Sequence, residues 1–132
     1  MADRLQRVNG TAVLICAPDG AKLSGERDAL DIIGEAGYQG ADWVAIPVSR
    51  FDDDFFRLRT RIAGEIIQKF ANYRLGVAVV GDISRHTAAG SALRDFVREA
   101  NQGTQVWFVS TLEDLYDRLG GGRRAGSGPG VD

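Results

Sequence analysis

The sequence predicts one α/β domain in which an N-terminal β-hairpin is followed by alternating helices and strands of a mainly parallel sheet. Three observations support this prediction. The chain has 132 residues, a usual length for one domain. An Asn9-Gly10 pair lies between two strand-like segments, as in a tight hairpin. Beyond it, short apolar segments alternate with amphipathic ones, which indicates parallel strands joined by right-handed helical crossovers.

The first elements follow from turn and capping residues. Residues 3–8 and 11–17 form the predicted hairpin, because Asn and Gly supply the two positive φ angles of a type I′ turn. Ser24 is the expected N-cap of the first helix, and two acidic residues follow it at the positive end of the helix dipole. Gly37 and Gly40 are expected to end this helix.

The central elements have the clearest patterns. Residues 42–48 (DWVAIPV) predict a strand, and residues 75–80 (LGVAVV) predict a parallel strand covered on both faces. Between them, Thr60 is expected to begin a helix whose apolar residues have the spacing of one buried face. These residues are Ile62, Ala63, Ile66, Ile67, Phe70 and Tyr73. Gly64, inside this helix, is expected to pack closely against a neighbouring element.

The last three elements complete the alternation. Residues 91–100 predict an amphipathic helix, and residues 105–110 (QVWFVS) predict a strand. Thr111 is the expected N-cap of the final helix, with Asp114 at the capping-box position.

Composition sets the domain bounds and excludes several classes of protein. The folded domain is expected to span residues 1–119, and residues 120–132 (GGGRRAGSGPGVD) predict a flexible glycine-rich tail. The formal net charge of −2 argues against nucleic-acid binding. No apolar run approaches the ~20 residues that a membrane-spanning helix needs. A lone cysteine, Cys16, favours a reducing cytoplasm.

Motifs for metals and cofactors are not found in the sequence. It contains no CxxC or HExxH pattern, and its glycines do not form a dinucleotide-binding fingerprint after a strand. We therefore expect no metal and no cofactor, and we name no catalytic residue.

The expected start of the second helix is the first candidate binding site. Arg57, Arg59 and Arg61 lie around Thr60, and Arg50 lies just upstream. A helix N-terminus with arginines around it favours an anion or a phosphorylated threonine. The alternative is that Thr60 is only a helix cap and that the arginines pair with the acidic run at residues 52–54.

Four further candidates lie at or near the expected carboxyl ends of strands, where α/β folds bind ligands. Phe55 and Phe56 are adjacent, so either one lies in the core and the other at a cleft or partner, or both lie in the core. Asp82 follows a strand and is either a ligand-binding carboxylate or the cap of a turn. His86, the single histidine, is either an acid–base group or a solvent-facing side chain.

Residues 10–119 resemble an uncharacterised bacterial family, domain of unknown function 4180 (DUF4180). The matching pieces are Pro47, Asp54-Phe55-Phe56, Leu58, Thr60, Ala63-Gly64-Glu65, Gln68-Lys69-Phe70, Tyr73-Arg74, Gly81-Asp82, Ser91, Leu93-Arg94-Asp95-Phe96 and Asn101. The chain departs from the family at Arg61, where the resemblance implies a glycine. The resemblance implies no established activity.

The order of elements is also similar to that of STAS domains, the fold of anti-sigma-factor antagonists. This similarity implies a binding and regulatory module whose partner kinase phosphorylates a Ser or Thr near a helix start, here Thr60, although the Asp-Ser-Ser-Gly loop of STAS domains is absent. The expected partner is a protein or a small anionic ligand, and a homodimer remains open. The alternative is a small cofactor-independent enzyme of the cyclase or isomerase type, with a pocket formed by Phe55 or Phe56, Arg57, Asp82 and His86.

Overall fold

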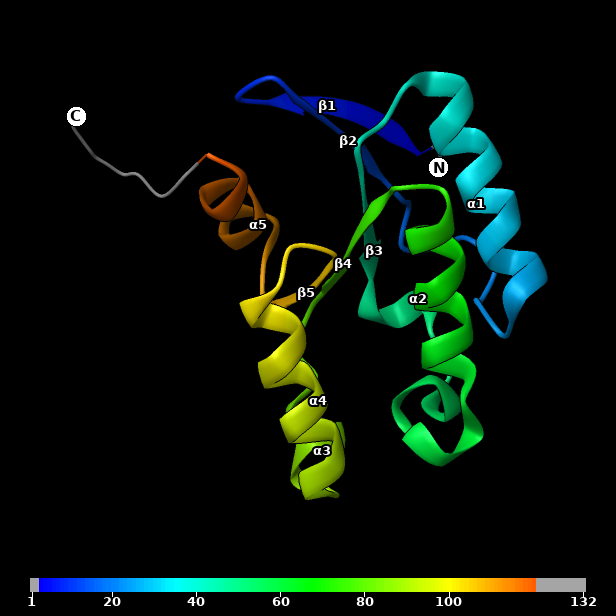
Figure 1. The fold of residues 1–132 in the computed structure, drawn as a ribbon, viewed down its shortest axis with the longest axis vertical. Coiled ribbons are helices and arrows are strands. Elements are labelled where there is room, and N and C mark those ends of the chain that lie inside the picture. The colour runs from blue at the N-terminus through cyan, green and yellow to red at the C-terminus, as the bar shows by residue number, and fades with distance from the viewer. Residues whose placement is uncertain (1–2, 121–132) are drawn as a thin grey trace.

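The computed structural model describes residues 3–120 and contains a five-stranded sheet with helices on both faces (Figure 1). The strands lie in chain order across the sheet, and only the first pair is antiparallel. Their bounds are β1 Arg4–Val8, β2 Thr11–Ile15, β3 Trp43–Pro47, β4 Gly76–Val80 and β5 Val106–Val109. The predicted α/β class is confirmed. The predicted tail, apart from Gly120, lies outside the described residues.

The hairpin forms as its turn residues predict. Asn9 has a φ of 51° and Gly10 a φ of 83°, so both lie in the left-handed region that a type I′ turn requires. Val8 pairs directly with Thr11, which leaves a two-residue turn between β1 and β2.

The helices form two unequal layers on the sheet. Because β2 to β5 follow one another in order, crossovers of one hand place their connecting helices on the same face. Helices α1, α2 and α4 pack on that face, and α5 packs on the opposite one (Figure 1). The helix bounds are α1 Glu26–Gln39, α2 Ile62–Asn72, α3 Ser84–Ala88, α4 Ser91–Gln102 and α5 Leu112–Leu119. The sequence did not predict the short α3.

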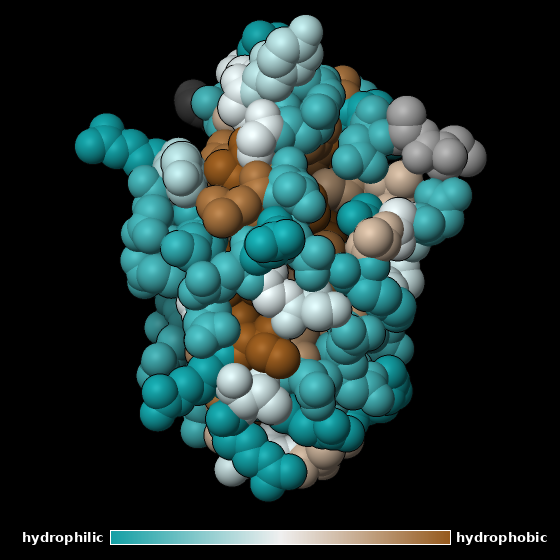
Figure 2. Space-filling model, turned by 90° about the vertical axis from the view of Figure 1, so that its right-hand side faces the viewer, coloured by the Kyte–Doolittle hydropathy of each residue, from teal (hydrophilic) through white to brown (hydrophobic). Residues whose placement is uncertain are grey.

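The core is divided by the sheet into two clusters. The larger cluster joins α1, α2 and α4 to strand residues such as Leu14, Val44 and Val77. The smaller cluster lies beneath α5 and includes Ala45 and Leu115. On the outer side of α1 and α2, hydrophilic side chains surround and divide the apolar areas (Figure 2).

Two tryptophans fill the smaller cluster near the amino ends of the parallel strands. The rings of Trp43 and Trp107 stack with their centroids 4.1 Å apart, and the Arg118 guanidinium lies 4.0 Å from the Trp107 centroid. Gly76 lies directly beneath Trp43, because a Cβ there would come within 2.3 Å of the indole. The missing side chain at Gly76 therefore makes room for the tryptophan stack.

A side-chain amide covers the free edge of the sheet at β5. Asn101 accepts a hydrogen bond from the Phe108 N–H at 2.7 Å, and its own amide N–H donates to the Phe108 carbonyl at 3.2 Å. These are the backbone groups of β5 that point away from β4. The amide thus makes the two hydrogen bonds that another strand would make.

Two helix starts lie one or two residues from their predicted positions. Gly25, not Ser24, is the N-cap of α1, because the Ser24 hydroxyl donates to Asp52 instead. Arg61, not Thr60, is the N-cap of α2, because Thr60 closes a 3₁₀ turn just before it. The N-cap of α5 is the predicted residue. Thr111 accepts from the Asp114 N–H at 3.1 Å, as predicted.

Two glycines differ from their predicted roles. Gly37 lies inside α1, and Gly40 alone ends that helix, with a φ of 74°. Gly64 has no neighbouring atom within 4 Å of the position that a Cβ would occupy. The predicted close packing at Gly64 is therefore wrong, and this part of α2 faces solvent.

Candidate functional site

The candidate site lies where the chain leaves the carboxyl ends of β3 and β4. After β3, the chain forms three short 3₁₀ turns, η1 Val48–Arg50, η2 Asp53–Phe56 and η3 Leu58–Thr60. After β4, it forms α3 and then α4. Because β3 and β4 are parallel neighbours, these two connections leave the same edge of the sheet and face each other.

A stacked pair of rings joins the two connections. The Phe56 ring from η2 and the His86 ring from α3 are nearly parallel, with centroids 4.0 Å apart and planes 14° apart. Both residues line three adjoining cavities, of about 470, 320 and 180 Å³. The stacked pair therefore forms a wall shared by the two larger of these cavities.

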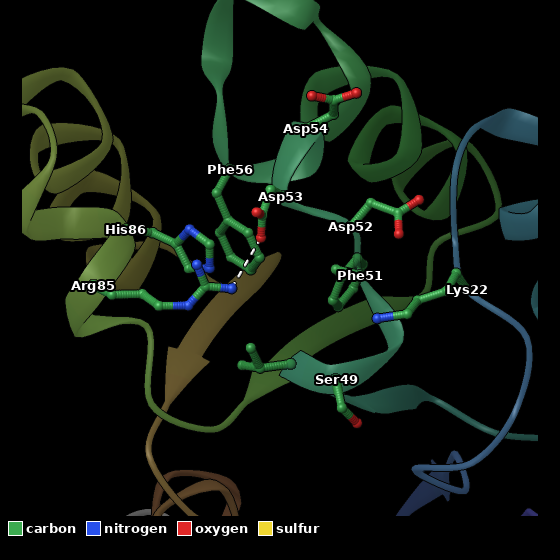
Figure 3. A pocket seen from close by; sticks show the side chains of 10 residues that line it. Lys22, Ser49, Phe51, Asp52, Asp53, Asp54, Phe56, Arg85 and His86 are labelled. Atoms are coloured by element: carbon green, nitrogen blue, oxygen red, sulfur yellow. Dashed lines mark hydrogen bonds and ion pairs between the residues drawn. The ribbon is translucent and has the colours of Figure 1, made fainter.

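The cavity of about 470 Å³, which we call the mixed-charge cavity, carries charges of both signs. Arg85 donates to Asp53 at 2.9 Å on the side of α3, and Lys22 reaches in from the segment before α1 (Figure 3). The Asp52 carboxylate also lines it and accepts from the Ser24 hydroxyl at 3.1 Å. Three carboxylates, Asp52, Asp53 and Asp54, line it against Lys22 and Arg85, so this cavity does not favour an anion.

The cavity of about 320 Å³, which we call the basic cavity, is different. Arg57 and Arg59 line it together with the first residues of α4, and no acidic residue does so. Arg57 pairs with Asp54 at 2.8 Å, but both side chains are more than half exposed. Within residues 3–120, the Arg59 side chain makes no ion pair or hydrogen bond. The basic cavity therefore offers one unpaired guanidinium and one in a weak, solvated pair.

The start of α4 adds a second favourable feature to the basic cavity. Gly90 is the N-cap of this helix, no side chain caps it, and its first turn contains no acidic residue. Gly90, Ala92 and Leu93 all line the cavity. The uncapped backbone N–H groups and the positive end of the helix dipole therefore lie beside the two arginines, an arrangement that stabilises anions.

The pKa of His86 is lowered from its ordinary value. Burial against Phe56 is the main cause, and the positive charge of Arg85 is the next, while Asp53 acts in the opposite direction. The imidazole is consequently neutral near pH 7. An anion bound beside His86 would raise its pKa, since it would favour the protonated form.

Comparison with known families identifies the chain. A family model described as "Domain of unknown function (DUF4180)" matches residues 8–119. The chain belongs to the DUF4180 family. No curated protein and no solved structure matched it.

The matched region of this DUF4180 domain includes the whole candidate site and four of the five strands in full. The backbone at Arg61, where the chain departs from the family, fits a glycine. This residue has a φ of 66°, in the left-handed region that glycine adopts without strain. The resemblance implies glycine at this position, and the backbone of the DUF4180 domain keeps the conformation that a glycine would favour.

Arg50, a predicted site residue, lies apart from the cavities. Only 7% of its surface is exposed, and its guanidinium donates to the carbonyls of Ala21 at 2.6 Å and Ala17 at 2.8 Å. Gly20 lies against it, since a Cβ there would come within 2.6 Å of the guanidinium carbon. Arg50 therefore holds the loop after β2 in place.

Phe55 and Phe56 are both buried in the larger core cluster, but only Phe56 also borders the cavities. Phe55 is 2% exposed and packs against Phe51 with ring centroids 4.1 Å apart, so it belongs to the core. Phe56 is also buried, but it lines all three cavities. The cleft-facing member of the pair is thus Phe56.

Thr60 and Asp82 are both engaged in local turns. The Thr60 hydroxyl lies 2.8 Å from the carbonyls of Asp54 and Arg57, and it accepts from the Ile62 N–H at 3.3 Å. Asp82 accepts from the Ser84 N–H at 2.8 Å, and this hydrogen bond lowers the pKa of the Asp82 carboxyl. Neither residue lines the three cavities around Phe56. Thr60 therefore closes the turn before α2, and Asp82 stabilises the turn before α3.

Sequence reasoning missed Lys22, Arg85 and the start of α4. Lys22 is distant in sequence from every other site residue, and no local motif connects it to them. The helix was predicted to begin at Ser91, but its start was not recognised as part of the site. Gly90, the N-cap, was the available sign that no side chain caps this helix.

In the described part of the chain, no group of three or more His, Cys, Asp or Glu residues is placed to hold a metal ion. Among the same residues, no helix has the length and apolar character needed to span a bilayer.

Proposed function

We propose that this DUF4180 domain is a non-catalytic binding module that holds a small anionic ligand, or the anionic group of a protein partner, in the basic cavity. One observation carries the proposal. Arg57, Arg59 and the uncapped N-terminus of α4 line the same cavity of about 320 Å³. Arginine binds carboxylate and phosphate through two parallel hydrogen bonds, and a helix N-terminus adds backbone donors.

The size and walls of the basic cavity support a ligand larger than a single ion. Its volume lies within the range of ~300–1,000 Å³ that is usual for small-molecule sites. Phe56 and Leu93 are buried and supply apolar wall, and Arg57 and Arg59 supply the charge. A phosphate or carboxylate on a small apolar or ring-shaped body matches this combination.

The binding module is favoured over the small enzyme because the proposed acid–base pair is not assembled. Asp82 is engaged with Ser84, while His86 stacks on Phe56. A regulatory role rests on the similarity of the element order to STAS domains. Phosphorylation at Thr60 stays a prediction, and it would have to displace the hydroxyl from two carbonyls and from the Ile62 N–H.

The proposal is tested by titrating the protein with inorganic phosphate and pyrophosphate in a calorimeter at low salt. We expect pyrophosphate to bind and Arg59→Gln to weaken its binding by about tenfold, the usual effect of losing one charge-assisted contact. Arg27→Gln is the matched control, because Arg27 is an exposed arginine on α1, away from the cavity. The affinity should also rise as the pH falls below 6.5, since protonated His86 adds a positive charge.

Two results would count against an anion-binding function. The first is wild-type protein that binds neither phosphate nor pyrophosphate. The second is an equal loss of affinity in Arg59→Gln and Arg27→Gln, which would show only a response to net charge.

A further inference from the structure

A further cavity, which we call the apolar cavity, lies on the opposite face of the sheet and is lined almost entirely by apolar residues. It has a volume of about 420 Å³. It also lies at the carboxyl ends of parallel strands, but on the face that α5 covers. Its lining consists of Arg4, Ile15, Cys16, Ala17, Pro18, Ala45, Pro47, Val80 and Leu112. None of these residues lines the three cavities around Phe56.

The apolar cavity exists because small residues and a short helix meet there. At the amino ends of the strands, Trp43 and Trp107 fill the space on this face. One step further along β3 on the same face, the side chain is only Ala45. Helix α5 reaches this end of the sheet only through Leu112, its first residue. The sheet therefore has a full layer at one end of this face and a hollow at the other.

The hollow is built from rigid parts of the fold. Ile15, Ala45 and Val80 come from three hydrogen-bonded neighbouring strands. The start of β1 is tied to the same place, because the Asp3 carboxylate accepts from the Ala17 N–H at 2.8 Å. Apolar walls fixed in this way lose little entropy when a ligand arrives, and each Å² removed from water contributes roughly 25 cal/mol.

Arg4 supplies the one charged side chain in the lining. It pairs directly with Ile15 across the hairpin, so both side chains project from the same face of the sheet. Among residues 3–120, its guanidinium makes only a long hydrogen bond of 3.4 Å to Gln6, and the side chain is exposed. An apolar hollow with a single, weakly engaged guanidinium fits a molecule with an apolar body and one negative charge.

We infer that the apolar cavity binds a small organic acid, such as a medium-chain fatty acid, with its hydrocarbon body on Ile15 and Ala45 and its carboxylate on Arg4. This site is separate from the basic cavity. It differs in ligand as well, because its walls are apolar and it holds one arginine, not two. Failure of anion binding at Arg59 would leave this inference standing, and the reverse is also true.

The inference is tested with octanoate as the probe and 1-octanol as its uncharged counterpart. Methyl spectra of isotope-labelled protein are recorded during each titration. We expect octanoate to shift the methyl signals of Ile15, Ala45 and Leu112, and 1-octanol to bind at least fivefold more weakly. Arg4→Gln should weaken octanoate binding at least fivefold. Arg7→Gln is the matched control, because Arg7 lies on the same strand but projects from the other face.

Ala45→Leu provides a second test, because it fills the hollow with an apolar side chain. We expect this variant to keep its fold and to lose octanoate binding. If it does not fold, the comparison of Arg4→Gln with Arg7→Gln still decides the question, since both residues are exposed.

Three outcomes would overturn the inference. The first is that octanoate leaves the three methyl signals unshifted at saturating concentrations. The second is that Arg4→Gln and Arg7→Gln bind octanoate equally well. The third is a wild-type dimer in sedimentation that Ala45→Leu dissociates, which would make the hollow an interface between two copies.

Discussion

Replacing Arg50 by methionine separates a structural arginine from a ligand-binding one. Methionine keeps most of the apolar stem of the side chain but removes the guanidinium. The carbonyls of Ala17 and Ala21 then lose the donors that now lie 2.8 and 2.6 Å away. Arg50 is 7% exposed and Ala17 is buried, so water reaches the Ala17 carbonyl poorly after the change, whereas Ala21 is exposed.

The expected loss of stability follows from those two hydrogen bonds. A hydrogen bond from a charged donor contributes roughly 1.5–3 kcal/mol, and a buried carbonyl without a partner costs about 1–3 kcal/mol. Allowing for partial rearrangement of the loop, we expect Arg50→Met to lower the free energy of unfolding by about 3 kcal/mol. For a domain of this size, that corresponds to a fall in melting temperature of about 12 °C.

Urea unfolding followed by tryptophan fluorescence measures this change, because Trp43 and Trp107 are both packed in the fold. Arg59→Met is the matched control, and we expect it to stay within about 0.5 kcal/mol of wild type, since Arg59 is exposed. Pyrophosphate titration of the same proteins should give the opposite order, with affinity lost in Arg59→Met and kept in Arg50→Met. The reasoning fails if Arg50→Met costs less than about 1 kcal/mol, or if the folded variant no longer binds.

Three further changes test other parts of the structure. Gly76→Ala should cost about 2–3 kcal/mol in urea unfolding, because its Cβ would come within 2.3 Å of Trp43, whereas Gly37→Ala should gain up to about 1 kcal/mol, since nothing lies within 4 Å. Equal effects of the two changes would contradict this packing. Arg61→Gly should raise the free energy of unfolding by about 0.5 kcal/mol, because it relieves a φ of 66°, and Arg61→Ala should give no such gain. The lowered pKa of His86 makes the unfolded state bind the proton more readily, so stability should fall as the pH drops from neutral through 6.5. Urea midpoints at several pH values should show this slope in wild type and lose it in His86→Gln; an unchanged slope would assign it to other groups.

The fold could be predicted because its signals are local. The Asn9-Gly10 turn, the apolar strands and the Thr111 cap each depend on residues only a few positions apart. The errors arose where distant contacts outweigh local preference. Ser24 fails to cap α1 because Asp52, far along the chain, takes its hydroxyl. Thr60 fails to begin α2 because its hydroxyl bonds back to the preceding turn.

The candidate site was predictable in location but not in membership. Parallel neighbours bring their carboxyl ends together, so Phe56 and His86 were expected near each other, although their stacking was not. Arg50 looked like a ligand-binding residue because it is close in sequence to Arg57. Its burial depends on the loop after β2, which no local pattern connects to it. The apolar cavity could not be predicted, because in the sequence its alanines and the short helix α5 look like ordinary core residues.

The amide of Asn101 has a consequence for how this sheet can be extended. A sheet with two open edges can recruit strands at both ends, and identical chains then add without limit. Here the Phe108 N–H and carbonyl are already satisfied, so within the described chain β1 is the more open edge. Two copies that joined through β1 would use up that edge in each. Strand-to-strand association would therefore favour a pair over continued growth into a fibre.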